Sequence, residues 1–301
     1  MRALLFGRDM VVGRLAPTPS GHLHLGNALA FGAAWLSVRR AAGRLLLRIE
    51  DVDRVRSRPE VADGQRADLR WLGLEWDEEV PAQSTRAYPL DGIPTYRCPC
   101  TRATRKALGC RCRHLAHDRG AWRFRAPTGP VTFEDRAHGV QAFAAESDPI
   151  LVRADGEAAY PLAVVLDDHR DGVTEVVRGG DLLEVTATQV ALYAALGWSP
   201  PTWLHVGVLM GADGKKLSKS HGSTEIRALR AIGWSPERVW ATLLPLLGCE
   251  ADRLEDAMLV PERVCRGEIG GVDRLAPLSP RSGERAGSTP LAPRSGERGR
   301  G

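Results

Sequence analysis

The chain has 301 residues, of which 43% are hydrophobic and 26% are charged, and these ordinary globular values exclude a wholly disordered or fibrous protein and allow one large domain or two small ones. The net charge of +4 permits a polyanionic partner without requiring one. The chain lacks an uncharged apolar run long enough to cross a membrane, and residues 1–9 hold too short an apolar core for a secretory signal, which together predict a cytoplasmic protein without a membrane contact.

The first 72 residues alternate between strand and helix patterns. In chain order we expect a buried strand, a turn-rich loop, a helix, a second buried strand and a second helix, at residues 11–16, 17–21, 25–42, 45–49 and 59–72. Gly43 and Gly73 stand where the two helices would end. Strand, crossover helix and strand in this order predict a parallel sheet with a right-handed connection.

Residues 81–125 break this alternation. They are poor in apolar residues and contain a cysteine cluster, formed by Cys98, Cys100, Cys110 and Cys112. In a chain without a secretory signal, clustered cysteines indicate metal ligands before disulfides. We therefore expect an insert that is held together by something other than a hydrophobic core.

From residue 150 onward the regular pattern resumes. We expect three strands and two helices, the strands at 150–153, 158–166 and 203–210 and the helices at 182–196 and from 235 to about 247. The tail at 271–301 is rich in Pro, Gly, Ser and Arg and contains a two-copy repeat, so we expect it to be disordered. We favour a repeat without function over a basic arm that touches nucleic acid.

Two loops carry candidate chemistry. The loop at 14–26 leads from the first strand into the first helix, where open parallel sheets bind ligands, and it presents His22 and His24 beside glycines that allow close approach of a ligand. The second loop, at 211–220, contains three of the four lysines of the chain. Clustered lysines supply point charges for phosphates. The alternatives are an ordinary turn with surface histidines and a solvated basic turn, and the concentration of lysine argues against the second.

These two loops resemble a known family. His24–Asn27 and Lys216–Ser220 resemble the signature motifs of class I aminoacyl-tRNA synthetases, and residues 17–26 resemble the glutamyl form of the first motif. Further blocks of the family resemble residues 48–51, 72–77 and 177–182, in the expected order. The resemblance covers roughly residues 11–225.

The length of the chain indicates which members of the family it resembles. A glutamyl-tRNA synthetase continues with a stem and an anticodon-binding domain, whereas this chain has only one or two further helices and the tail. The short C-terminus and the cysteine cluster are similar to the glutamyl-Q tRNA(Asp) synthetase family. We therefore expect an α/β protein with four parts: a Rossmann-type parallel-sheet catalytic domain, a small zinc-binding insert within it, a helical stem remnant and a disordered tail, at 1–234, 91–125, 235–270 and 271–301.

This resemblance implies a function. A member of the family activates L-glutamate with ATP and passes the glutamyl group to the queuosine base of tRNA(Asp), and Mg²⁺ accompanies the ATP. Two alternatives stay open, namely a truncated conventional synthetase that charges a tRNA 3′ end and a non-catalytic paralogue that binds tRNA or a nucleotide. A monomer is the simplest expectation for the oligomeric state.

The resemblance also implies roles for individual residues. It forms a glutamate pocket from Arg14, Leu15, Ala16, Pro17, Thr18, Glu50, Tyr160 and Arg178. In this pocket the Arg14 guanidinium would bind the side-chain carboxylate, and Glu50 would bind the ammonium group. The resemblance further implies an ATP site formed by His24, Gly26 and Lys219, and catalytic roles for His22, His24, Lys216 and Lys219. There the histidines donate to the phosphates and Lys219 holds them, with Lys216 in support.

For the cysteine cluster the residues and the family agree on one structural zinc per chain. Zinc prefers four soft ligands in a tetrahedron. The family's site uses Cys-x-Cys followed by a tyrosine and a cysteine four residues apart, and Leu108 stands where that tyrosine is expected. Cys110 is the obvious replacement, and His114 or His117 is the alternative. A site without metal is the remaining interpretation.

Asp167-Asp168-His169 follows the strand expected at 158–166 and invites a metal-site interpretation. A solvated strand end explains it equally well. We favour a structural or tRNA-facing role and leave the triplet out of the predicted site.

Overall fold

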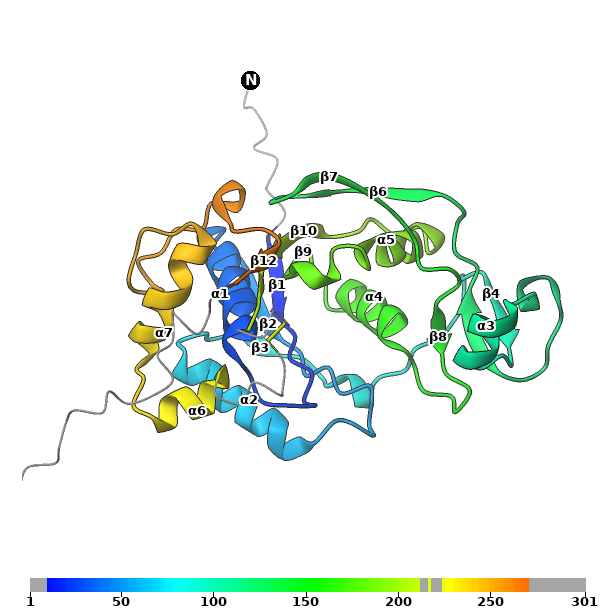
Figure 1. The fold of residues 1–301 in the computed structure, drawn as a ribbon, viewed down its shortest axis with the longest axis horizontal. Coiled ribbons are helices and arrows are strands. Elements are labelled where there is room, and N and C mark those ends of the chain that lie inside the picture. Colours follow the sequence, from blue (N-terminus) through cyan, green and yellow to red (C-terminus); the bar gives the residue numbers. More distant parts are fainter. Residues whose placement is uncertain (1–9, 212–215, 218–223, 271–301) are drawn as a thin grey trace, which may run out of the picture.

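The computed structural model describes residues 10–211, 216–217 and 224–270 (Figure 1). Its first sheet has three short parallel strands in the order β1-β2-β3, namely β1 (Val12–Leu15), β2 (Arg44–Leu47) and β3 (Glu78–Glu79). Helices α1 (Leu25–Arg40) and α2 (Pro59–Trp71) connect them, and a 3₁₀ turn, η1 (Gln83–Thr85), follows. The parallel sheet expected from the sequence is confirmed.

Helix α1 begins at Leu25, as predicted, and ends at Arg40, two residues before the predicted end. Its N-cap is His24, whose backbone N–H donates to the Asn27 side chain at 3.0 Å. At the other end Ala42, with φ of +49°, takes the left-handed conformation that we expected of Gly43. Gly43 is required for another reason, because a Cβ there would lie 2.3 Å from the carbonyl oxygen of Val11.

The second sheet has the order β7-β6-β10-β9, formed by β6 (Pro130–Asp135), β7 (Gly139–Ala144), β9 (Glu175–Gly179) and β10 (Thr202–Val206). Strands β9 and β10 are parallel, and β6 and β7 form an antiparallel hairpin that the sequence analysis did not predict. The backbone N–H of Thr174 donates to Val12 O at 2.8 Å and joins the start of β9 to β1. The carboxyl ends of β1, β2 and β9 therefore lie close together.

Two elements of the second half differ from the prediction. Of the strand expected at 158–166, residues 160–166 belong instead to helix α4 (Tyr160–Arg170), which has Pro161 in its first turn and is buried from Leu162 to Asp168. A helix buried on all sides shows the same continuous apolar run as a buried strand. The strand expected at 203–210 is divided at Gly207 into β10 and β11 (Val208–Leu209).

Helix α5 (Thr186–Ala195) starts four residues later than we expected, after the 3₁₀ turn η3 (Gly180–Leu182). It ends before Gly197, whose φ is +70°. Its end at the predicted glycine is thus confirmed.

The cysteine-bearing insert lies at the opposite end of the molecule from α7 (Pro236–Leu243) (Figure 1). It contains α3 (Arg102–Leu108), the 3₁₀ turn η2 (Cys112–His114) and an antiparallel sheet in the order β4-β5-β8, formed by β4 (Thr95–Cys98), β5 (Ala121–Phe124) and β8 (Ile150–Val152). Tyr96, Cys98 and Cys112 are buried in this insert, and the half-buried Cys100 and Cys110 pack against them. Phe124 of β5 and Leu151 of β8 belong instead to the core cluster that includes α4. The part of the insert around the cysteines therefore has little apolar burial of its own.

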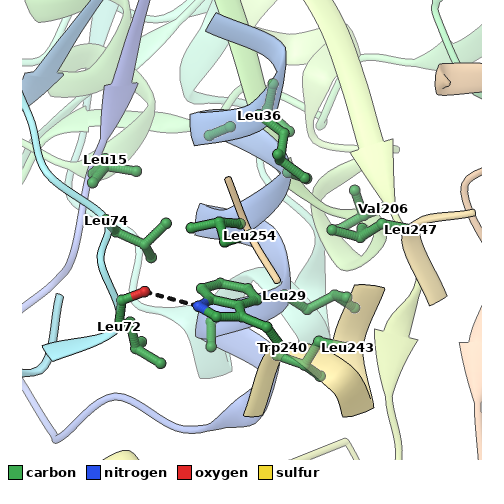
Figure 2. Close-up of a cluster of buried hydrophobic side chains, with 14 of the residues drawn as sticks. Leu15, Leu29, Leu36, Leu72, Leu74, Val206, Trp240, Leu243, Leu247 and Leu254 are labelled. Atoms are coloured by element: carbon green, nitrogen blue, oxygen red, sulfur yellow. Dashed lines mark hydrogen bonds between the residues drawn. The ribbon is translucent and has the colours of Figure 1, made fainter. Parts of the chain in front are cut away.

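The C-terminal segment packs on the first sheet's helices. It contains α6 (Ile226–Ala231), α7, the 3₁₀ turns η5 (Leu244–Leu247) and η6 (Pro261–Arg263) and β12 (Glu268–Ile269), which pairs with β11. Figure 2 shows Trp240 of α7 among leucines of α1 and the α2–β3 connection, with its indole N–H donating to Leu72 O at 2.8 Å. The division at residue 234 stays a prediction, and the tail at 271–301 lies outside the described residues.

Among the helices of the described ranges, none combines the length and the apolar character that crossing a bilayer requires.

Candidate active site

A cavity of about 480 Å³ opens where β1, β2 and β9 end and α1 begins. Most residues implied by the family resemblance line it, namely Arg14, Ala16, Pro17, Thr18, His22, His24, Gly26, Glu50, Tyr160, Arg178 and Lys216. Leu15 is different: its side chain is fully buried in the core. Successive side chains of a strand point to opposite faces, so Leu15 cannot share the cavity face with Arg14 and Ala16. Lys219 lies outside the described residues.

The Arg14 guanidinium is fixed by hydrogen bonds to Asp168 and to the backbone of Val177. It is 5% exposed, and its Nε donates to Asp168 Oδ1 at 3.2 Å while Nη1 lies 3.4 Å from Val177 O. These contacts fix the side chain at the end of β1. A fixed arginine fork of this kind matches the two oxygens of a carboxylate.

Asp168 joins Arg14 to a second buried arginine that the sequence analysis did not single out. Arg48 Nη2 donates to Asp168 Oδ1 at 2.6 Å and to Glu50 Oε1 at 3.2 Å, and Arg48 Nη1 donates to Asp171 at 3.0 Å. Burial acts to raise the pKa of Asp168, but Arg14 and Arg48 outweigh it, and the pKa lies below its usual value. Asp168 is therefore a buried anion that organises the cavity.

This placement settles the interpretation of the Asp167-Asp168-His169 triplet. Asp167 and Asp168 are 0% and 2% exposed, so the solvated strand end was wrong and the structural role that we favoured is confirmed for both. Asp167 accepts from Arg86 and from the Tyr88 hydroxyl, both at 2.9 Å. The available signal was the helix start at Pro161, which would have placed both aspartates in a helix rather than at a strand end.

Glu50 supplies the negative side of the cavity. Burial raises the pKa of Glu50 above its usual value, although Arg48 and then Arg14 act in the opposite direction. A ligand ammonium beside this carboxyl would favour its ionised form further. The cavity therefore presents a cation and an anion on the ends of adjacent parallel strands.

Arg178 and Tyr160 lie together at the β9 side of the cavity. Arg178 Nη1 donates to the Tyr160 hydroxyl at 3.3 Å, and Nη2 donates to Thr186 Oγ1 at 2.8 Å. Burial raises the pKa of Tyr160, so its hydroxyl keeps its proton and stays a donor. Arg178 adds a second guanidinium to a cavity that already contains Arg14.

His24 lines the cavity at the start of α1. Its Nδ1 accepts from the Gly26 N–H at 3.1 Å, which assigns the hydrogen of the neutral ring to Nε2. A Cβ on Gly26 would lie 3.0 Å from His24 Cε1, so Gly26 makes room for this ring. The N-terminus of a helix also favours anions, since its backbone N–H groups and dipole face them.

His22 and Lys216 complete the described part of this side. Burial and then Arg227 lower the pKa of His22, so it is neutral near pH 7. Lys216 pairs with Asp181 at the edge of the cavity, and Leu217 beside it is buried. The lysine loop thus reaches the cavity in its described part.

The four cysteines form a group that could hold a metal ion. All four sulfurs lie within 4.8 Å of one another, with 3.6 Å between Cys98 and Cys110 and 3.5 Å between Cys100 and Cys112. A Zn–S bond of about 2.3 Å places the sulfurs of a tetrahedral site about 3.8 Å apart, so the spacing fits. Leu108 is 84% exposed and is not part of this group.

Comparison with known proteins agrees with this geometry. The family model for the catalytic domain of class I tRNA synthetases (E and Q) matches residues 10–94 and 109–263. The glutamyl-Q tRNA(Asp) synthetases of Nitratidesulfovibrio vulgaris and Symbiobacterium thermophilum are 44% and 41% identical, over 81% and 79% of this chain and 88% and 87% of theirs. Glutamate--tRNA ligase 2 of Rhodospirillum rubrum is 41% identical over 75% of this chain and 55% of its own.

A solved structure shares the fold. The crystal structure of a glutamate tRNA ligase from Elizabethkingia meningosepticum in complex with its amino acid superposes with a TM-score of 0.74 and 22% identity, over 90% of this chain and 69% of that one. The family match and the relatives together confirm the resemblance seen in the sequence. The chain belongs to the class I aminoacyl-tRNA synthetases of the glutamyl and glutaminyl type and is a ligase.

Proposed function

We propose that the protein activates L-glutamate with ATP and transfers the glutamyl group to the queuosine base of tRNA(Asp). The observation that carries the first step is the pair formed by Arg14 and Glu50, which place opposite charges in one cavity next to the N-terminus of α1. Glutamate has a carboxylate at each end and an ammonium group at one end. The cavity offers a partner for each of these groups and a helix terminus for phosphates.

In the bound state Arg14 receives the side-chain carboxylate and Glu50 receives the ammonium. Tyr160 and Arg178 complete the pocket and hold the α-carboxylate toward the nucleotide. A neutral side-chain amide offers one acceptor oxygen and an NH₂ group that would oppose the guanidinium N–H donors of Arg14, whereas a carboxylate offers two acceptor oxygens, which selects glutamate over glutamine.

The reaction is a displacement followed by an acyl transfer. A glutamate α-carboxylate oxygen attacks the α-phosphorus of ATP, the bond to the bridging oxygen breaks, and pyrophosphate leaves. A hydroxyl of the cyclopentenediol ring then attacks the carbonyl carbon, loses its proton and forms an ester as AMP leaves. Positioning and stabilisation of charge on the phosphoryl oxygens carry the first step, and His22, His24, Lys216 and Lys219 are the groups proposed for it.

Two metals accompany this proposal. In the described residues, the cysteine cluster is the only place where three or more side chains gather with metal-ligand geometry. Zinc in this cluster would hold the insert together, and Mg²⁺ would be bound by the ATP phosphates and water. Neither metal is needed to position Arg14 or Glu50.

The queuosine assignment is supported by sequence identity and by the share of each relative that the match covers. The match covers 88% and 87% of the two relatives named glutamyl-Q tRNA(Asp) synthetase. It covers only 55% of the Rhodospirillum rubrum glutamate--tRNA ligase 2, although that ligase is 41% identical to this chain, as is the second of the two relatives. The similarity to that ligase supports a second candidate function, which is attachment of glutamate to a tRNA 3′ end. We propose a monomer in either case.

The test is glutamate-dependent exchange of pyrophosphate into ATP, with and without tRNA. Exchange without tRNA, followed by glutamate on the queuosine nucleotide of tRNA(Asp) after nuclease digestion and mass spectrometry, supports the proposal. Glutamate on the 3′-terminal adenosine establishes the second candidate instead. Absence of exchange under all conditions refutes both.

A further inference from the structure

A buried pair formed by Asp135 and His205 contacts Arg178 of the proposed glutamate pocket. The His205 Nδ1 and the Asp135 Oδ2 are 2.6 Å apart, and the Arg178 Nε donates to the His205 Nε2 at 3.1 Å. Both members of the pair have side chains that are 0% exposed. The contacts therefore form one line from a carboxylate through an imidazole to a guanidinium.

The backbone places these residues in register. Strand β10 pairs with β9 so that His205 stands opposite Arg178, and it pairs with β6 at its Trp203, opposite Asp135. The Trp203 ring also lies 5.0 Å from the Arg178 guanidinium carbon. The three interacting side chains thus come from three neighbouring strands rather than from a loop.

The hydrogen bonds assign one tautomer to His205. An arginine Nε can only donate, so the His205 Nε2 must accept and the ring hydrogen must be on Nδ1, where it donates to Asp135. Asp135 also accepts backbone N–H groups of Ala137 and His138 at 3.0 and 2.9 Å. Burial, more than the neighbouring Arg178, lowers the pKa of His205 to about 4, although Asp135 acts against it, so the ring is neutral near pH 7.

We infer that the Asp135–His205 pair acts as a positioning device that orients Arg178 toward the substrate carboxylate by fixing an acceptor on its Nε. This inference rests on the proposed binding of glutamate. With Nε engaged by His205 and Nη2 by Thr186, the guanidinium plane is set, and its Nη1 side meets Tyr160 at the cavity. Neither Asp135 nor His205 needs to touch the substrate.

The decisive comparison is between His205→Phe and His205→Gln. Phenylalanine keeps a ring in the buried site but offers no acceptor, whereas the glutamine carbonyl oxygen can replace Nε2 as the acceptor for Arg178. Loss of one charge-assisted hydrogen bond at the pocket predicts a rise in glutamate KM of about tenfold for His205→Phe, with the KM for ATP unchanged. His205→Gln restores most of the glutamate KM. Equal rises in both KM values, or no difference between the two variants, overturn the inference.

Asp135→Asn provides a second variant. The asparagine oxygen can still accept from Ala137 and His138, but its NH₂ group would replace Oδ2, which also accepts the His205 backbone N–H at 3.1 Å. The NH₂ group would donate to His205 Nδ1 and move the ring hydrogen to Nε2, where it opposes Arg178. We expect a higher glutamate KM with an unchanged ATP KM. A wild-type glutamate KM in this variant contradicts the role of Asp135.

A measurement without turnover separates this inference from the proposed function. Long-range ¹H–¹⁵N spectra of histidine-labelled wild-type protein report the tautomer, with His205→Gln identifying the signal. The Nδ1–H tautomer is expected, and the Nε2–H tautomer overturns the inference. Wild-type protein without pyrophosphate exchange refutes the proposed function, while the tautomer still decides whether the positioning pair exists.

Discussion

Replacing Asp168 with asparagine tests the buried charge network at the cavity. The substitution keeps the shape of the side chain but removes the charge that Arg14 and Arg48 share at 3.2 and 2.6 Å. Breaking a buried pair by removing one partner costs roughly 3–5 kcal/mol, because an uncompensated charge stays buried. Arg48 keeps Glu50 and Asp171, whereas Arg14 keeps only the longer contact to the Val177 carbonyl, so Arg14 bears most of this cost.

The assay is thermal and urea unfolding of Asp168→Asn at pH 7. For a protein of this size a loss of roughly 3–5 kcal/mol lowers Tm by on the order of 10 °C. Asp63→Asn is the matched control, because Asp63 pairs with Arg66 at 2.9 Å while its side chain is 78% exposed. An exposed pair contributes at most about 1 kcal/mol. Equal changes in Tm for the two variants would refute the reasoning.

The same residue predicts a dependence on pH. The pKa of Asp168 is lowered in the folded protein, so its contribution to stability is fully present above the unfolded value of about 4 and is lost as the pH falls through the folded value. Wild type and Asp168→Asn should therefore converge in unfolding free energy at the lowest pH at which both fold. A gap that stays constant down to that pH would contradict the assignment of the charge.

Three further predictions concern other parts of the chain. Lys219→Ala should lower pyrophosphate exchange by roughly a hundredfold through loss of a phosphate contact. Lys106→Ala, at an exposed lysine, is the control and should leave the exchange unchanged. Equal exchange activities of the two variants would reject the role of Lys219. Atomic absorption should find about one zinc ion per chain in the wild-type protein. Cys110→Ser should lose this zinc, whereas the control Cys249→Ser should retain it. Zinc retained by both variants would exclude Cys110 as a ligand. Because burial raises the pKa of Asp68 to about 6, ionisation of Asp68 destabilises the folded protein by an amount that grows between pH 4 and 6 and is complete above pH 6. Asp68→Asn should therefore stabilise the protein at pH 8 more than at pH 4. An equal effect on the unfolding free energy at both pH values would show that the group ionises at no cost.

The sequence predicted the elements whose signals are local. The strand at 11–16, the helix beginning at Leu25 and the helix at 59–72 each have an apolar period and recognisable ends, and all three are present within one or two residues. The cysteines were also readable, since spacing alone suggested a shared ligand set. In these cases a few neighbouring residues determine the structure.

The failures arose where tertiary contacts decide. The run at 158–166 is buried on every side, so it lacks the polar face that distinguishes a helix from a strand. Arg48 and Asp168 lie 120 positions apart, and no local pattern indicates that they meet. The same holds for Asp135 and His205, which only the pairing of β6 with β10 brings together.

The contacts around α1 also constrain how the chain folds during synthesis. The indole of Trp240 reaches the carbonyl of Leu72 across 168 positions, and the start of β1 is joined to Thr174 across 162. Contacts of such long range close late, because the chain entropy of a large loop must be lost first. The nascent N-terminal half therefore leaves the ribosome with its apolar surface uncovered, and chaperone binding to that half should persist until α7 has been translated.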